Sequence, residues 1–172
     1  MYNYILLSLL LLSFQQNFKE SKYKSNRNNQ TLFVIERNKN NNIIYYDANL
    51  TSAEKINKDT PIDVYYIHFA TDGKRAELSL IERKLAYGYS FEMTNNNTFQ
   101  ITLKAYKDRK ISLFQDKNHK VYAKIKINGI DAYLKKLYVF AKPNLYTSVL
   151  YIEIYGEDIK TKSLLYEKIV NN

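Results

Sequence analysis

The chain has 172 residues, no cysteine, four glycines and a formal net charge of +9. The missing cysteine excludes disulfides, thiol catalysis and thiolate metal sites. The glycines, at Gly73, Gly88, Gly129 and Gly156, are too far apart to form a phosphate-binding loop. Two histidines are too few for a three-histidine metal site. We therefore expect one domain that holds no metal and no cofactor.

The positive charge is spread along the chain and consists mainly of lysine. It falls in short groups, at 104–110, 124–126 and 135–136, on segments that also carry polar or acidic residues. A nucleic-acid surface concentrates its charge and favours arginine, which can bridge phosphates. The charge therefore predicts a solvated basic face and no nucleic-acid partner.

The N-terminus is apolar and uncharged over Met1–Phe14, and the first charged side chain is that of Lys19. This length suits the hydrophobic region of a signal peptide and is too short for a membrane-spanning helix. We expect residues 1–18 to be a signal peptide or an uncleaved N-terminal anchor, with no further membrane span. Residues 19–30 read as a disordered spacer and 31–170 as a single β-rich domain that is exported, either periplasmic or secreted.

Most of the remaining chain alternates apolar and polar residues, which is typical of antiparallel strands with one buried face. A turn dipeptide, Asn128-Gly129, predicts a tight hairpin. The fold class is therefore mainly β, an antiparallel β-sandwich with a closed barrel as the alternative, of about nine to ten strands. The strands with the clearest pattern are Thr31–Arg37, Ile43–Asn49, Ile62–Phe69, Phe99–Tyr106, Val121–Ile127, Ile130–Ala141, Leu150–Tyr155 and Leu164–Val170.

One segment, Glu77–Tyr87, has helical spacing instead. Leu78, Ile81 and Leu85 would share the buried face of a helix of about three turns. Gly88 follows, where a glycine that ends a helix would stand. Another turn is expected at Asp72-Gly73.

Four phrases resemble DUF4833, a family of exported domains of unknown function. The phrases are Phe33-Val-Ile-Glu-Arg37 with Ile44-Tyr-Tyr, Pro61-Ile-Asp-Val-Tyr-Tyr-Ile67, Glu77-Leu-x-x-Ile-Glu-Arg83-x-x-Ala-Tyr-Gly88 and Tyr151-Ile-Glu-Ile-Tyr-Gly156. The resemblance spans the predicted folded domain and implies a single exported domain, with no activity attached. Tyr66 stands where the family is expected to favour tryptophan.

Two Glu-Arg dipeptides, Glu36-Arg37 and Glu82-Arg83, stand out among the charged residues. If the helix docks near the first strand, Arg83 could pair with Glu36, or Arg37 with Glu82. Such pairs would either lock the helix to the sheet or hold an anionic ligand. The candidate ligand-binding residues are Arg37, Tyr66, Glu77, Glu82, Arg83 and Tyr87.

No catalytic motif occurs in the sequence, so no catalytic residue is assigned. The expected function is a non-enzymatic module of the cell envelope that binds a ligand or a protein partner. The alternative is an envelope glycan hydrolase that uses paired carboxylates, for which Glu36, Glu77 and Glu82 are the candidates. Tyrosine clusters in the first half suit a sugar-stacking platform or half-buried strand positions, at Tyr45, Tyr46, Tyr65, Tyr66, Tyr87 and Tyr89.

Overall fold

The computed structural model describes residues 30–38, 40–68, 73–95, 97–142 and 149–171. The expected signal or anchor, nearly all of the spacer and Asp72 lie outside these ranges. The described strands are β1 (Thr31–Arg37), β2 (Asn40–Ala48), β3 (Ile62–Ile67), β4 (Arg75–Glu77), β5 (Tyr89–Asn95), β6 (Thr98–Leu103), β7 (Ile111–Gln115), β8 (Val121–Ile127), β9 (Ile130–Ala141), β10 (Val149–Asp158) and β11 (Leu164–Val170). A helical segment comprises α2 (Leu80–Glu82) and the π-helical η2 (Arg83–Tyr87).

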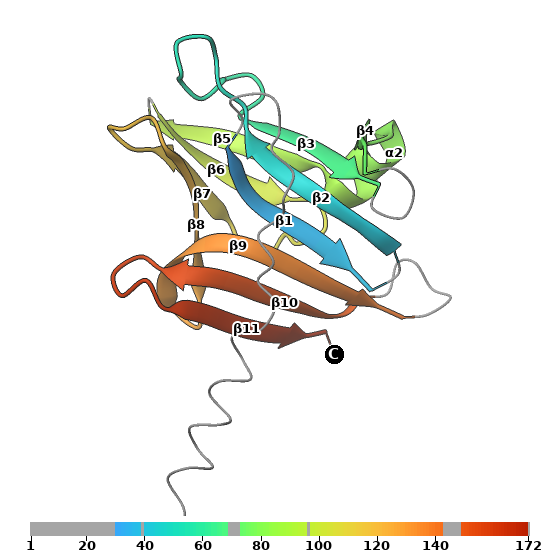
Figure 1. Cartoon of the computed structure of the whole chain (residues 1–172). Coiled ribbons are helices and arrows are strands. Elements are labelled where there is room, and N and C mark those ends of the chain that lie inside the picture. Colours follow the sequence, from blue (N-terminus) through green and yellow to red (C-terminus); the bar gives the residue numbers. More distant parts are fainter. Residues whose placement is uncertain (1–29, 39, 69–72, 96, 143–148, 172) are drawn as a thin grey trace, which may run out of the picture.

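The strands form one curled sheet in the order β4-β3-β2-β1-β9-β8-β7-β6-β5, and β10 and β11 extend it beside β9. The long strand β9 is the branch point. One of its edges pairs with β8 near its start and with β1 near its end, and the other edge pairs with β10. The sheet therefore folds over into a half-barrel, with β5–β8 behind β1–β3 and β9–β11 (Figure 1).

The prediction of a mainly β fold is confirmed, but the sheet is mixed rather than antiparallel throughout. Strand β1 runs parallel to β9, with Val34 opposite Lys136 and Arg37 opposite Val139. The other strand pairs described are antiparallel. Alternation within one strand fixes which face is buried and carries no information about the direction of a distant partner.

The hairpin between β8 and β9 has the predicted turn. Asn128 and Gly129 both have positive φ angles, of 48° and 80°, as a two-residue turn with the twist of a hairpin requires. Asparagine and glycine adopt a left-handed backbone at little cost. Next to the turn, Ile127 and Ile130 form the first residue pair of the two strands.

The core lies inside the curl, between the two halves of the sheet. Phe33 and Tyr46 stack there with ring centroids 4.5 Å apart, and both are almost completely buried. Two tyrosine hydroxyls link β2 and β3 to the helical segment and to β5. That of Tyr46 donates to the carbonyl of Tyr87 at 2.6 Å, and that of Tyr89 bonds both the amide and the carbonyl of Ile62. Buried backbone groups at this open side of the curl are thereby satisfied.

The helical segment is shorter than expected and faces the other way. Glu77 belongs to β4, and the helix begins at Leu80 after the capping residue Ser79. Leu78 is buried as expected, whereas Ile81 and Leu85 are each 71% exposed. The later start and the wider π turn move these two residues off the stripe that regular α-helical spacing predicts. Within the described residues, no helix is long and apolar enough to cross a membrane.

Gly88 follows the helical segment directly, but its backbone is extended, with φ −70° and ψ 175°. Its role is therefore close approach and not left-handed backbone. A Cβ atom at this position would collide with the carbonyl oxygen of Arg83.

Gly88→Ala is expected to lower the free energy of unfolding by about 1–3 kcal/mol, because the π turn must shift to admit the methyl group. Urea denaturation followed by circular dichroism measures this loss. Ser90→Ala, on the exposed side of β5, is the matched control and should change stability by less than about 0.5 kcal/mol. Equal stability of the two variants would contradict the proposed contact.

Candidate functional site

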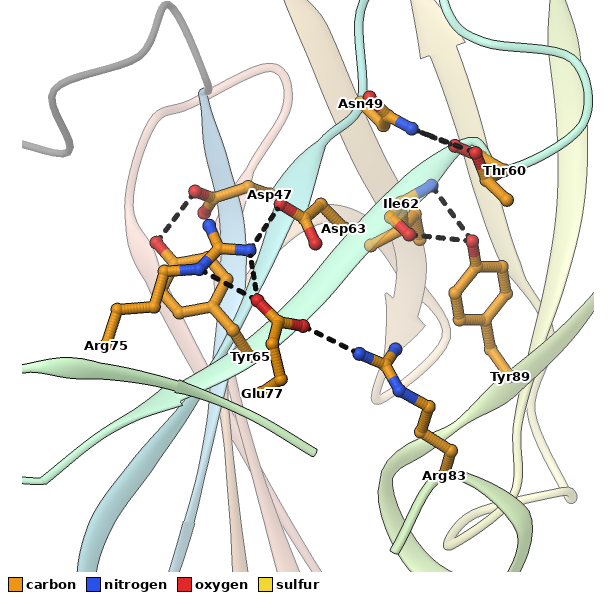
Figure 2. A network of polar contacts seen from close by, with 10 residues as sticks. All are labelled: Asp47, Asn49, Thr60, Ile62, Asp63, Tyr65, Arg75, Glu77, Arg83 and Tyr89. Carbon is orange, nitrogen blue, oxygen red and sulfur yellow. Dashed lines mark hydrogen bonds and ion pairs between the residues drawn. The ribbon is translucent and has the colours of Figure 1, made fainter. Parts of the chain in front are cut away.

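The predicted site region lies at a corner of the sheet where β3, β4 and the helical segment meet, and Arg75 is at its centre (Figure 2). Its Nη2 atom donates to Asp63 Oδ2 at 3.0 Å and to Glu77 Oε1 at 2.8 Å. The guanidinium carbon lies 3.9 Å from the ring centroid of Tyr65. One arginine thus bridges two carboxylates and covers an aromatic ring.

Glu77 extends the network to the helical segment. Its Oε2 atom accepts from Arg83 Nη2 at 2.8 Å (Figure 2). Arg83 Nε also donates to the carbonyl of Leu78. The expected pairing of Arg83 with Glu36 is wrong, since Glu36 binds Lys136 at 3.3 Å. Glu36 lies on β1, and β2 and β3 separate β1 from β4, the strand that precedes the helical segment.

Glu82 has a local role. Its side chain accepts from the amide and the hydroxyl of Ser79, both at 2.8 Å, and the Ser79 hydroxyl accepts from the amide of Glu82. This capping box fixes the start of the helix. The expected pairing of Glu82 with Arg37 is therefore wrong as well.

Arg37 instead contacts Tyr87. Its Nη1 atom donates to the Tyr87 hydroxyl at 3.3 Å, and its guanidinium carbon lies 5.7 Å from the ring centroid. Tyr66 is half-buried against the core and meets His68 edge-on, with centroids 4.6 Å apart. The structure thus brings Glu77 to Arg83 and Arg37 to Tyr87, while Tyr66 and Glu82 contact other residues.

A buried carboxyl lies beside this corner. Asp47 is completely buried, and its Oδ2 atom accepts from the Tyr65 hydroxyl at 2.8 Å (Figure 2). Burial raises the pKa of Asp47, and burial with the neighbouring Asp47 raises the pKa of Tyr65. Sequence reasoning missed Asp47 because its neighbours in the chain resemble those of an ordinary strand.

The ion pairs of this corner limit the reactions and the ligands that it can support. Asp63 and Glu77 are close enough for a glycosidase pair, since both bind one nitrogen of Arg75. A glycosidase must leave the space between its carboxylates to the sugar, and here the guanidinium fills it. An anionic ligand would in turn have to displace Glu77 from Arg75 or Arg83. The ion pairs of Glu77 with Arg75 and Arg83 therefore hold the helical segment to the sheet.

Arg83→Ala is expected to lower the free energy of unfolding by about 0–1 kcal/mol, because the ion pair with Glu77 is solvent-exposed. Thermal unfolding should show a fall of a few degrees at most. The adjacent exposed Lys84→Ala serves as the control and should leave the midpoint unchanged. A cooperative loss of the fold in Arg83→Ala would show that the Arg83–Glu77 ion pair contributes more to stability than a solvent-exposed pair normally does.

A second surface lies on the outer side of β9, β10 and β11, and we call it the aromatic face. Phe140 and Tyr151 stack with centroids 4.8 Å apart, and Tyr138 lies 6.5 Å from Tyr151. Tyr155 and Tyr166 contact each other at 5.2 Å. Five rings from three neighbouring strands therefore form a strip across the sheet: Tyr138, Phe140, Tyr151, Tyr155 and Tyr166.

Charged groups lie among these rings. Lys168 sits 3.6 Å from the ring centroid of Tyr151. Glu153 accepts from the hydroxyls of Tyr155 and Tyr166, at 2.7 Å and 3.1 Å. Burial and the bond to Glu153 raise the pKa of Tyr155. The face combines apolar rings with donors and acceptors that are fixed in position.

Sequence reasoning placed its tyrosine cluster in the first half of the chain, where Tyr45, Tyr46, Tyr65 and Tyr87 are in fact buried. The signal for the aromatic face was present in the alternation of Tyr151, Glu153 and Tyr155 with buried isoleucines. The neighbouring strand β9 contributes its rings only through strand pairing. Within the described residues, no cluster of three histidine or carboxylate side chains could hold a metal ion.

The fold and these surfaces define a mainly β protein with a curled mixed sheet, an ion-paired corner and an aromatic outer face. A family model, the domain of unknown function DUF4833, matches residues 33–168, and the chain belongs to this family. The match begins in β1 and ends in β11, so it takes in nearly the whole half-barrel. No curated protein and no solved structure matches the chain.

Proposed function

We propose that this domain is an exported, non-enzymatic binding module of the cell envelope, and that it binds a glycan chain on its aromatic face. The observation that carries the proposal is the strip of five rings on β9, β10 and β11. Tyrosine rings offer flat apolar surfaces to the C–H faces of sugars, and their hydroxyls bond sugar hydroxyls. Glu153 and Lys168, which lie 3.9 Å apart, add a carboxylate and an ammonium group beside the rings.

A binding role fits better than hydrolysis because the closest carboxylate pair of the corner holds Arg75 between its members. Export is supported by the apolar, uncharged Met1–Phe14 ahead of the folded domain. Fractionation of cells that produce the full chain, followed by mass spectrometry of its N-terminus, tests export. Recovery of the intact chain in the cytoplasm would refute this part of the proposal.

Tyr151→Ala is expected to weaken binding to peptidoglycan sacculi or chitin by about ten-fold, the equivalent of one aromatic contact. Co-sedimentation of the full chain with each polymer measures the affinity, and circular dichroism confirms the fold. The matched control is Tyr122→Ala, which removes a ring from a different stack, with Tyr133 on β8 and β9. Binding that survives in Tyr151→Ala would contradict the proposed face. Release of soluble sugar by the unaltered chain would favour the hydrolase.

A further inference from the structure

The helical segment exposes three large aliphatic side chains to solvent. Leu80 is 86% exposed, and Ile81 and Leu85 are 71% exposed. They lie within little more than one helical turn, and we call them the apolar ridge. The segment is attached to the core through Leu78, just before it, and Tyr87, its last residue, both buried. The ridge therefore contributes little to packing within the domain.

The degree of exposure indicates what the ridge can contact. A side chain that keeps more than two thirds of its surface projects beyond its neighbours and does not line a groove. A folded partner would need a matching cavity for each of three projecting side chains. A lipid bilayer accepts them at no such cost, because its acyl region is fluid and apolar. The shape favours a membrane surface over a protein.

The charges around the ridge point to the same occupant. Lys84 lies between Ile81 and Leu85 and is exposed. The amide of Lys104 donates to the carbonyl of Gly88 at 2.9 Å, which places the β6–β7 loop, with exposed Lys104 and Lys107, at the end of the segment. Among the carboxylates near the segment, Glu77 binds two arginines and Glu82 caps the helix, while exposed Asp108 in the same loop offsets one of the lysines. Positive charge next to apolar side chains is the pattern that binds anionic lipid headgroups.

We propose that the apolar ridge inserts Leu80, Ile81 and Leu85 into the interfacial region of an anionic lipid bilayer, with the flanking lysines at the headgroups. Residues 1–29 precede the described domain and begin with an apolar stretch that, as a signal or an anchor, would deliver the chain to a membrane. The α2 and β11 elements lie at opposite sides of the molecule (Figure 1). A domain seated on its ridge would thus keep β11 at a distance from the lipid.

The test uses the absence of cysteine, which allows a single label on the full chain. Ile81→Cys carries an environment-sensitive fluorophore, and Leu164→Cys, 79% exposed on β11, is the matched control. With vesicles of phosphatidylcholine and phosphatidylglycerol, the label at 81 should shift to the blue, brighten several-fold and be quenched by brominated lipid. The label at 164 should not respond. Vesicles of phosphatidylcholine alone should give a weaker response at 81.

Substitution in the labelled background completes the test. Leu80→Ser with Leu85→Ser should reduce the apparent affinity reported at 81 by at least ten-fold, whereas Met93→Ser with Val170→Ser should leave it unchanged. A label at 81 that stays in water while the chain floats with the vesicles overturns the proposal, as does a failure to bind vesicles. A label already shielded in solution overturns it in favour of contact with a second copy. Each outcome is independent of glycan binding.

Discussion

Tyr46→Ala is expected to lower the free energy of unfolding by about 3–5 kcal/mol, the range for loss of a large buried aromatic side chain. Tyr46 is completely buried and stacks on Phe33 between the two halves of the sheet. Its hydroxyl also bonds the carbonyl of Tyr87, the residue that ends the helical segment. One side chain thus fills the core and ties the helix to it.

The two contributions can be separated. Tyr46→Phe keeps the ring and leaves the Tyr87 carbonyl without its donor, which costs about 1–3 kcal/mol for a buried group. Urea denaturation should therefore rank the unaltered chain above Tyr46→Phe, and Tyr46→Phe above Tyr46→Ala. Tyr166→Ala, at an exposed tyrosine of β11, is the control and should lose much less. If Tyr46→Ala loses no more than Tyr166→Ala, the core does not lie between the sheet halves as described.

The strands that sequence reasoning placed best are those whose pattern is local. Val121–Ile127 and Ile130–Ala141 coincide with β8 and β9, because strict alternation and an Asn-Gly turn need no distant partner. Three strands were not predicted. Strand β4 has three residues, β5 alternates apolar and polar residues but is largely exposed, and β7 follows a loop of charged residues. Their residues pair because neighbouring strands present open edges to them.

The candidate site was located more accurately than it was explained. The Glu-Arg dipeptides pointed to the corner where the helix meets the sheet, and Glu77 and Arg83 do meet there. The partners of Glu36 and Glu82 were wrong, since they depend on the face that each side chain takes and on the start of the helix. Arg75, the centre of the network, had no sequence signal, because its role arises from the pairing of β3 with β4.

Arg109→Ala is expected to lower the free energy of unfolding by about 2–3 kcal/mol, as loss of hydrogen bonds to a partly buried charge does. Arg109 lies in the β6–β7 loop and binds both carboxylate oxygens of Glu167 on β11. It also donates to the carbonyl of Lys126 at 2.8 Å. Arg109→Lys keeps the charge without the two-pronged geometry and should lose an intermediate amount. The neighbouring exposed Lys110→Ala is the control.

The same pair makes a prediction about acid. The bonds from Arg109 and from the Asn128 amide hold the pKa of Glu167 below its usual value of 4.5. A carboxylate with a lowered pKa in the folded state stabilises the fold above its unfolded pKa, and the contribution is lost as the pH falls through the folded value. Stability of the unaltered chain should therefore exceed that of Arg109→Ala at neutral pH, and the difference should shrink below about pH 4.5.

Urea midpoints measured between neutral pH and about pH 3 provide this difference, and acids common to both proteins cancel in it. Asp131 and Asp158 also have lowered pKa values, whereas burial raises that of Asp47. Asp47 therefore contributes with the opposite sign, since protonation on acidification relieves its buried charge. A difference between the two proteins that stays constant through acid would show that Arg109 stabilises β11 through its bond to Lys126 and its packing, and not through the charge of Glu167.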